Sequence, residues 1–172
     1  MTSPPAFAAS ETVLVVDDDV TTRASLLAVL ASAGIAAIAA ASAEQALALQ
    51  ADHEPALVVI DYLLPDRNGL ELAQLLKDRE PSLPILLLTG SASLETAIAA
   101  VGQVDGYLLK PMATETFIEA VRRALAQGAL VVENRQLTTR LERLSQNQAL
   151  YDPLTGLPNR ALLDDRINQA LA

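Results

Sequence analysis

The chain has 172 residues, 51% of them hydrophobic, and a formal net charge of −9 at pH 7, so one domain with a buried core and a smaller appendage is expected. Residues 1–121 carry 16 acidic and 5 basic side chains. Such an acidic body argues against nucleic-acid binding, which needs a basic surface. The absence of cysteine excludes disulfide frameworks and cysteine-based metal sites, and it fits the cytoplasmic location that we expect. No apolar run approaches the ~20 residues that span a membrane. Residues 1–10 lack the basic residue of a signal peptide and are expected to form a disordered tail.

Short apolar runs that are typical of strands alternate along the chain with segments that are typical of helices. This βα repeat predicts an α/β fold in which five parallel strands form one doubly wound (βα)5 sheet, flavodoxin-like, with helices on both faces. The predicted strands are 12–16, 35–39, 57–61, 85–88 and 106–109, and the predicted helices are 21–33, 43–50, 70–79, 93–101 and one that begins near Thr114.

Polar side chains follow four of these strands. They are Asp17, Asp18 and Asp19 after the first strand, Asp61 after the third, Thr89 after the fourth and Lys110 after the fifth. Because parallel strands of such a sheet bring their carboxyl ends to one edge, these groups should converge. Mg²⁺ prefers oxygen ligands, so the set predicts a Mg²⁺ site beside a phosphorylatable aspartate, Asp61. A simpler interpretation is that the acidic triplet only caps the helix that follows it.

The helical pattern that begins near Thr114 continues to about Leu150, and Pro153 ends it. Beyond residue 128, residues at heptad spacing with charged flanks are typical of a parallel two-stranded coiled coil. The alternative is a single amphipathic helix that folds back on the body. The expected dimer seam consists of Leu130, Asn134, Leu137, Leu141, Leu144 and Gln148.

Taken in order, the strand-end motifs resemble those of a response-regulator receiver domain over about residues 11–128. The motifs are Val-Val-Asp-Asp-Asp ending at Asp19, Asp61 with Pro65 and Gly69, Leu-Leu-Thr-Gly ending at Gly90, and Gly-Tyr-Leu-Leu-Lys-Pro ending at Pro111. The resemblance implies phosphoryl transfer to Asp61 from a sensor histidine kinase or a histidine phosphotransfer protein. A homodimer is expected through the coiled-coil helix of residues 129–150 and the face of helix four, strand five and helix five. The resemblance also implies Mg²⁺ held by Asp17, Asp18, Asp61 and the backbone carbonyl of Leu63, phosphoryl binding by Lys110, and a switch pair of Thr89 and Tyr107.

Two features depart from the usual receiver pattern. Leu63 and Ser91 flank the site, and neither is an acidic or amide residue that would orient an attacking water, so slow dephosphorylation is expected. Segment 101–105 differs from the usual small-residue turn before the fifth strand.

The peptide 152–160, Asp-Pro-Leu-Thr-Gly-Leu-Pro-Asn-Arg, is similar to the opening of a diguanylate cyclase (GGDEF) domain, although the active-site signature of that domain is absent. We therefore expect a part of a longer response regulator with a cyclic di-GMP-related output, and no enzymatic activity in this chain. The expected domains are a disordered tail (1–10), a receiver domain (11–128), a coiled-coil signalling helix (129–150) and the truncated start of a GGDEF domain (151–172).

Two rival hypotheses come from other classes. The run from Asp17 to Thr21 fits the Asp-x-Asp-x-Thr pattern of haloacid-dehalogenase-like phosphohydrolases, in which Asp17 would be the nucleophile. This alternative leaves Asp61 without a role, and no strand ending in an acidic pair follows Lys110. The other rival is a scaffold that dimerises without being phosphorylated. It differs from the receiver hypothesis in whether Asp61 accepts a phosphoryl group.

Overall fold

The computed structural model describes residues 12–90 and 103–150, with residues 142–150 as helical backbone. The chain divides into two compact units, Met1–Leu130 and Val131–Ala172. In the first unit, five parallel strands form one sheet in the order β2-β1-β3-β4-β5. The strands are β1 (Val13–Val16), β2 (Ala37–Ala40), β3 (Leu57–Asp61), β4 (Ile85–Thr89) and β5 (Gly106–Leu109), and the helices are α1 (Val20–Ser32), α2 (Ala43–His53), α3 (Gly69–Arg79) and α5 (Thr114–Leu150).

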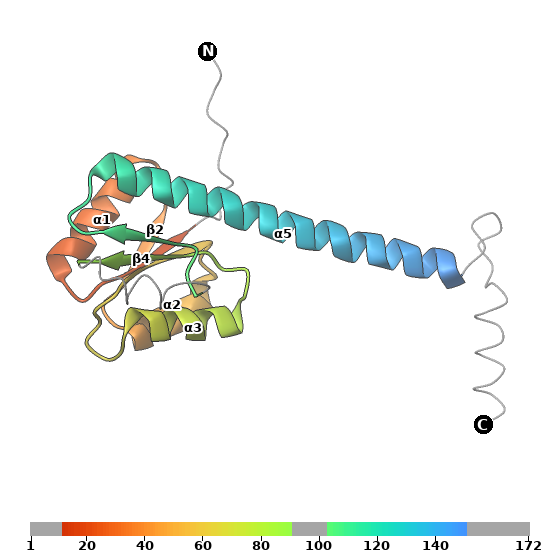
Figure 1. Ribbon diagram of the computed structural model, residues 1–172, viewed down its shortest axis with the longest axis horizontal. Helices are drawn as coiled ribbons and strands as arrows, with labels where there is room; N and C mark the ends of the chain where they lie inside the picture. The colour runs from red at the N-terminus through yellow and green to blue at the C-terminus, as the bar shows by residue number, and fades with distance from the viewer. Residues whose placement is uncertain (1–11, 91–102, 151–172) are drawn as a thin grey trace, which may run out of the picture. The chain divides into compact units, whose positions relative to one another are not determined.

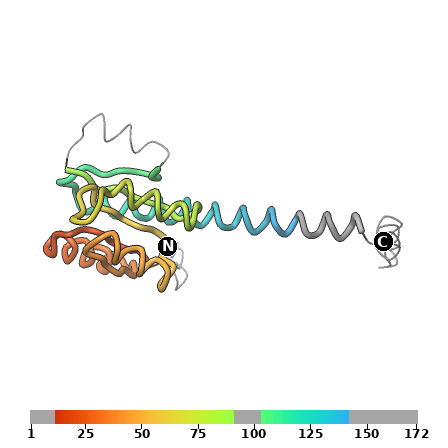
Figure 2. Tube along the Cα trace, turned by 90° about the horizontal axis from the view of Figure 1, so that it is seen from below, coloured from red at the N-terminus to blue at the C-terminus, as the bar shows by residue number. Residues whose placement is uncertain are grey.

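The sheet separates two apolar cores, because successive residues of a strand point to opposite faces. Leu14 and Val58 pack with α2 and α3 on one face, whereas Val13 and Leu57 pack with α1 and the first turns of α5 on the other. Figure 1 shows α1 and the first turns of α5 on one side of the sheet and α2 and α3 on the other. Figure 2 looks from the α2 and α3 side, where these two helices lie next to each other. The predicted doubly wound (βα)5 sheet, covered on both faces, is therefore confirmed.

Helix α5 packs closely against the edge of the sheet at which the strands begin. Gly128 is buried, and a Cβ atom there would lie 2.5 Å from Cγ of Pro84, the residue that precedes β4. Such a distance is shorter than van der Waals contact, so any other residue at this point would require the helix or Pro84 to shift. From residue 129 to residue 141 every described α5 side chain is exposed, and Gly128 is therefore the end of the buried face.

The second strand was predicted two residues too early. Strand β2 is Ala37–Ala40, whereas the pattern indicated 35–39. Ile35 N donates to Leu30 O at 3.0 Å, so the backbone of Ile35 is still hydrogen-bonded to the last turn of α1 and not to the sheet. Gly34, with φ of +73°, reverses the chain there. The helix that was predicted over 93–101 lies outside the described residues.

Two side chains cap helix α2 from different parts of the chain. Ser42, the N-cap, accepts from Gln45 N at 3.2 Å, and Gln45 Oε1 accepts from Ala41 N at 2.8 Å, one residue before the cap. Asp66, in the loop after β3, adds a second cap that the sequence did not indicate. Its Oδ1 accepts from Ala43 N at 3.1 Å and its Oδ2 from Glu44 N at 3.0 Å.

In the second unit, α5 continues as helix to Leu150, where the sequence predicted that it would end. The described part of the predicted seam is exposed: Leu130, Leu137 and Leu141 have 58%, 51% and 66% of their surface accessible. Within the described ranges, no helix is long and apolar enough to cross a membrane.

Candidate functional site

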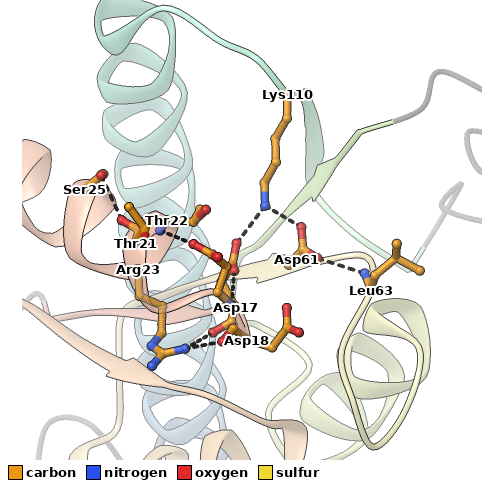
Figure 3. A network of polar contacts seen from close by, with 10 residues as sticks. Asp17, Asp18, Thr21, Thr22, Arg23, Ser25, Asp61, Leu63 and Lys110 are labelled. Atoms are coloured by element: carbon orange, nitrogen blue, oxygen red, sulfur yellow. Dashed lines mark hydrogen bonds and ion pairs between the residues drawn. The ribbon is translucent and has the colours of Figure 1, made fainter.

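Lys110 joins two carboxylates at the carboxyl-terminal edge of the sheet. Its Nζ lies 2.7 Å from Oδ2 of Asp17 and 2.6 Å from Oδ1 of Asp61 (Figure 3). The three residues follow or end β1, β3 and β5, and Lys110 is 93 and 49 residues away from its two partners along the chain. Strands β1 and β3 are neighbours in the sheet, and the order in which successive strands are added reverses at this pair. Open α/β sheets bind their ligands at such a switch point.

Both carboxylates are withdrawn from solvent and held at their second oxygen. The side chain of Asp17 is 2% exposed and that of Asp61 is 12% exposed. Asp17 Oδ1 accepts from Asp19 N at 2.9 Å, and Asp61 Oδ2 accepts from Leu63 N at 3.0 Å. Each carboxylate therefore has one bond to the ammonium and one to a backbone amide, which together fix its orientation.

The acidic triplet divides into three different roles. Asp17 belongs to the Lys110 network, whereas Asp19 is the N-cap of α1, with Oδ1 accepting from Thr22 N at 2.6 Å. Backbone hydrogen bonding by Thr22 lowers the pKa of Asp19. Asp18 is exposed, and no described residue donates a hydrogen bond to its carboxylate. The interpretation of the triplet as a helix cap therefore holds for Asp19 alone.

Arg23 is a part of the site that sequence reasoning missed. From the first turn of α1 its Nη1 donates to the backbone oxygen of Asp17 at 2.6 Å and to that of Asp18 at 2.9 Å (Figure 3). The only signal in the sequence was a basic residue five positions after an acidic pair, which is common on helix surfaces. Its contact with carbonyl groups rather than with carboxylates cannot be read from spacing.

The protonation of Lys110 reflects two opposed effects. Burial alone would lower the pKa of Lys110, but hydrogen bonds and charge attraction from Asp17 and Asp61 outweigh it and raise the pKa above the ordinary value of 10.5. The amine is therefore an ammonium at neutral pH. It neutralises part of the charge that would otherwise push the two carboxylates apart.

The remaining predicted site residues lie around this network in different environments. Thr89 ends β4 and is 4% exposed, whereas the side chain of Tyr107 on β5 is 55% exposed. The peptide of Leu63 lies beside Asp61, and its side chain is 72% exposed. Gly69 closes the loop, because a Cβ there would collide with the backbone oxygen of Asp61. Ser91 lies outside the described residues.

The donor set suits a hard divalent cation in its chemistry but not as a closed cage. Asp17, Asp18 and Asp61 offer carboxylate oxygens, and with the ammonium of Lys110 they leave two formal negative charges that a divalent ion could neutralise. Among the described residues, however, no three acidic or histidine side chains gather closely enough to form a metal site. A cation here would therefore rely on a few protein oxygens and keep several waters, as Mg²⁺ does.

The chain is similar to known proteins in sequence and in fold. Residues 13–122 match the family described as Response regulator receiver domain. The transcriptional regulatory protein FixJ of Rhizobium meliloti is 34% identical over 162 residues, which cover 90% of this chain and 79% of FixJ. The C4-dicarboxylate transport transcriptional regulatory protein DctD of Pseudomonas aeruginosa is 34% identical over 151 residues, which cover 87% of this chain and 32% of DctD. The chain thus spans about a third of DctD. The crystal structure of a CheY-like receiver domain from Methanospirillum hungatei superposes with a TM-score of 0.67 at 28% identity, covering 70% of this chain and 98% of that one.

Proposed function

This chain belongs to the response-regulator receiver family, and from that premise we propose that Asp61 is its phosphoacceptor. The observation that carries the proposal is the ammonium of Lys110 at 2.6 Å from Oδ1 of Asp61. A carboxylate oxygen of Asp61 attacks the phosphorus of a phosphohistidine on a sensor kinase or a phosphotransfer protein. The P–O bond forms as the P–N bond breaks, and the imidazole leaves with the electron pair. Lys110 neutralises charge on a phosphoryl oxygen.

Mg²⁺ is the proposed cofactor, with Asp17, Asp18, Asp61 and the carbonyl of Leu63 as its ligands. The oxygen-only donor set and its uncompensated negative charge support this choice. When bound, the ion lowers the repulsion between the acidic site and the incoming phosphoryl group.

Thr89 and Tyr107 are the proposed switch. Thr89 is buried at the end of β4, beside the acceptor strand β3, and this location supports a role in which its hydroxyl follows a new phosphoryl group. Tyr107 is exposed in the present structure and turns inward when Thr89 moves. The added charge of nearly two units supplies the driving force.

The proposed output is a dimer signal carried by α5. The exposed leucines at 130, 137 and 141 support a coiled-coil seam, which would continue through Asn134, Leu144 and Gln148. The residues 152–160, which lie outside the described part, support a cyclic di-GMP-related domain in the full protein. Nucleic-acid contact by this chain remains excluded from the proposal on charge, although the relatives named above are transcriptional regulators.

The family match argues against the phosphohydrolase alternative, in which Asp17 would be the nucleophile. In the structure Asp61 shares the ammonium with Asp17, so Asp61 lies inside the site, where that alternative gave it no role. The scaffold hypothesis is decided by the following test.

Intact mass after incubation with Mg²⁺ and a small-molecule acyl phosphate tests the acceptor. We expect one added phosphoryl group on the unmodified chain and on Asp66→Asn, a matched control that alters an exposed carboxylate in the same loop. Asp61→Asn should gain none. A phosphorylated Asp61→Asn variant would refute the assignment, and an unreactive unmodified chain would favour the scaffold.

A further inference from the structure

Arg23 holds the two peptide groups on either side of Asp18. The backbone oxygen of Asp17 belongs to the peptide that precedes the Asp18 Cα, and the backbone oxygen of Asp18 belongs to the peptide that follows it. One atom, Arg23 Nη1, donates to both, at 2.6 Å and 2.9 Å (Figure 3). Fixing both peptide planes fixes the direction in which the Cα–Cβ bond of Asp18 points.

The neighbouring acids do not need this help. Asp17 is fixed by Lys110 and by Asp19 N, and Asp61 is fixed by Lys110 and Leu63 N. The carboxylate of Asp18 is exposed, and no described residue bonds to it, so its orientation depends on the backbone beneath it. Ordering a free side chain has an entropic cost at the moment of binding, and a backbone that is already fixed reduces it.

Arg23 holds the backbone of Asp18 without occupying its carboxylate. Because it binds carbonyl oxygens, the side-chain oxygens of Asp18 stay available to a ligand. A guanidinium that paired with the carboxylate itself would compete with a cation for the same oxygens.

We propose that Arg23 is a positioning residue that orients the Asp18 carboxylate for cation binding. The inference rests on the proposed Mg²⁺ site, and it assigns to Arg23 a role that acts through Asp18 rather than through direct contact with the ion. Partners that orient metal ligands are typically worth roughly 10- to 100-fold in metal affinity. With one of three carboxylates affected, we expect the lower end of that range.

The test is an NMR titration of the full chain with Mg²⁺ alone, following the backbone amides of Asp18, Asp19 and Leu63. Arg23→Gln should weaken Mg²⁺ binding about tenfold. Arg79→Gln is the matched control, because Arg79 Nη1 also donates to a backbone oxygen, that of Leu47 at 3.0 Å, away from the site. Its Mg²⁺ affinity should equal that of the unmodified chain.

A double-mutant cycle separates positioning from a general loss of stability. In an Asp18→Asn background, Arg23→Gln should change the affinity by less than about twofold, since the carboxylate that it positions is gone. An equal loss in both backgrounds, or the same loss in Arg79→Gln, overturns the inference. If Arg23→Gln does not fold, Arg23→Met carries the test: it keeps an apolar stem but has no hydrogen-bond donor for the two carbonyl oxygens, and an affinity equal to the unmodified chain overturns the inference.

The two proposals fail in different ways. If the unmodified chain shows no Mg²⁺-dependent shift at these amides, the Mg²⁺ site itself is refuted, and the role of Arg23 with it. If the unmodified chain binds Mg²⁺ and Arg23→Gln binds it equally well, only the role of Arg23 is refuted.

Discussion

Replacing Lys110 by methionine removes the ammonium that lies between Asp17 and Asp61. Methionine keeps much of the apolar stem, so the change isolates the charge. Breaking a buried ion pair by removing one partner costs about 3–5 kcal/mol, because the remaining charge is left without compensation. The Lys110 side chain is 28% exposed, and solvent screening reduces that figure. We expect a loss of about 2–3 kcal/mol in the free energy of unfolding at pH 7.

Urea unfolding followed by circular dichroism measures this loss, which corresponds to a fall in melting temperature of roughly 10 °C. Lys77→Met is the matched control, since Lys77 Nζ also lies 2.8 Å from a carboxylate, that of Asp105, but this partner is 39% exposed. Asp105 Oδ2 additionally keeps its bond from Ile85 N. The control should therefore lose less than about 1 kcal/mol.

The same variant makes a prediction about pH and Mg²⁺. Because the folded-state pKa of Lys110 is raised above 10.5, its stabilisation is fully present below pH 10.5 and is lost as the pH rises through the folded value. The difference in the free energy of unfolding between the unmodified chain and Lys110→Met should therefore become smaller at high pH. Mg²⁺ should stabilise the variant more than the unmodified chain, since it replaces the missing positive charge. A loss at pH 7 no larger than that of Lys77→Met would refute the reasoning.

Three further changes test the surroundings of the site. Gly69→Ala should cost about 2–3 kcal/mol, because its Cβ would meet the Asp61 backbone and lie 3.0 Å from the Cα of Tyr62; Gly90→Ala, with open space around its Cβ, should be nearly neutral in the same urea assay. Asp18→Asn should stabilise the fold without Mg²⁺ by about 0.5–1 kcal/mol through reduced repulsion and should weaken Mg²⁺ binding; a destabilised variant would contradict this. Burial raises the pKa of Asp66, but bonds from two α2 amides outweigh it and lower the pKa below 3.8, so its stabilisation is present above pH 3.8 and lost as the pH falls through the folded value. In acid titrations Asp66→Ala should therefore lose under about 1 kcal/mol at neutral pH, and this difference should vanish in acid.

The strand-end chemistry was predictable because topology alone brings it together. Parallel strands with right-handed crossovers leave one edge for Asp17, Asp61 and Lys110, whatever the detailed packing. The apolar runs were long enough to identify β3 and β4. Because both faces of these strands are apolar, their burial was predictable too. The alanine-rich run before β2 gave no periodic signal, so its start was misplaced by two residues.

The contacts that orient the site were not predictable, because they depend on long side chains that reach backbone atoms. Arg23 bonds to carbonyl oxygens five and six residues back, and Asp66 bonds to amides 22 and 23 residues back. Nothing in residue type or spacing distinguishes these side chains from ordinary solvated ones. Their roles appear only when the loop conformations are known.

The close packing of Gly128 against Pro84 has a consequence for recombination between regulators. Residues of α5 up to Gly128 contribute to the receiver core, whereas the described side chains that follow it are exposed. A crossover in the gene at or beyond the codon of Leu130 therefore exchanges the downstream part and leaves intact the buried contacts of α5 that the structure describes. A crossover upstream of Gly128 would put a Cβ atom against the Pro84 ring wherever the incoming sequence has a residue other than glycine at this position. The glycine thus marks how far inward a foreign C-terminal segment can be joined before the receiver itself must be redesigned.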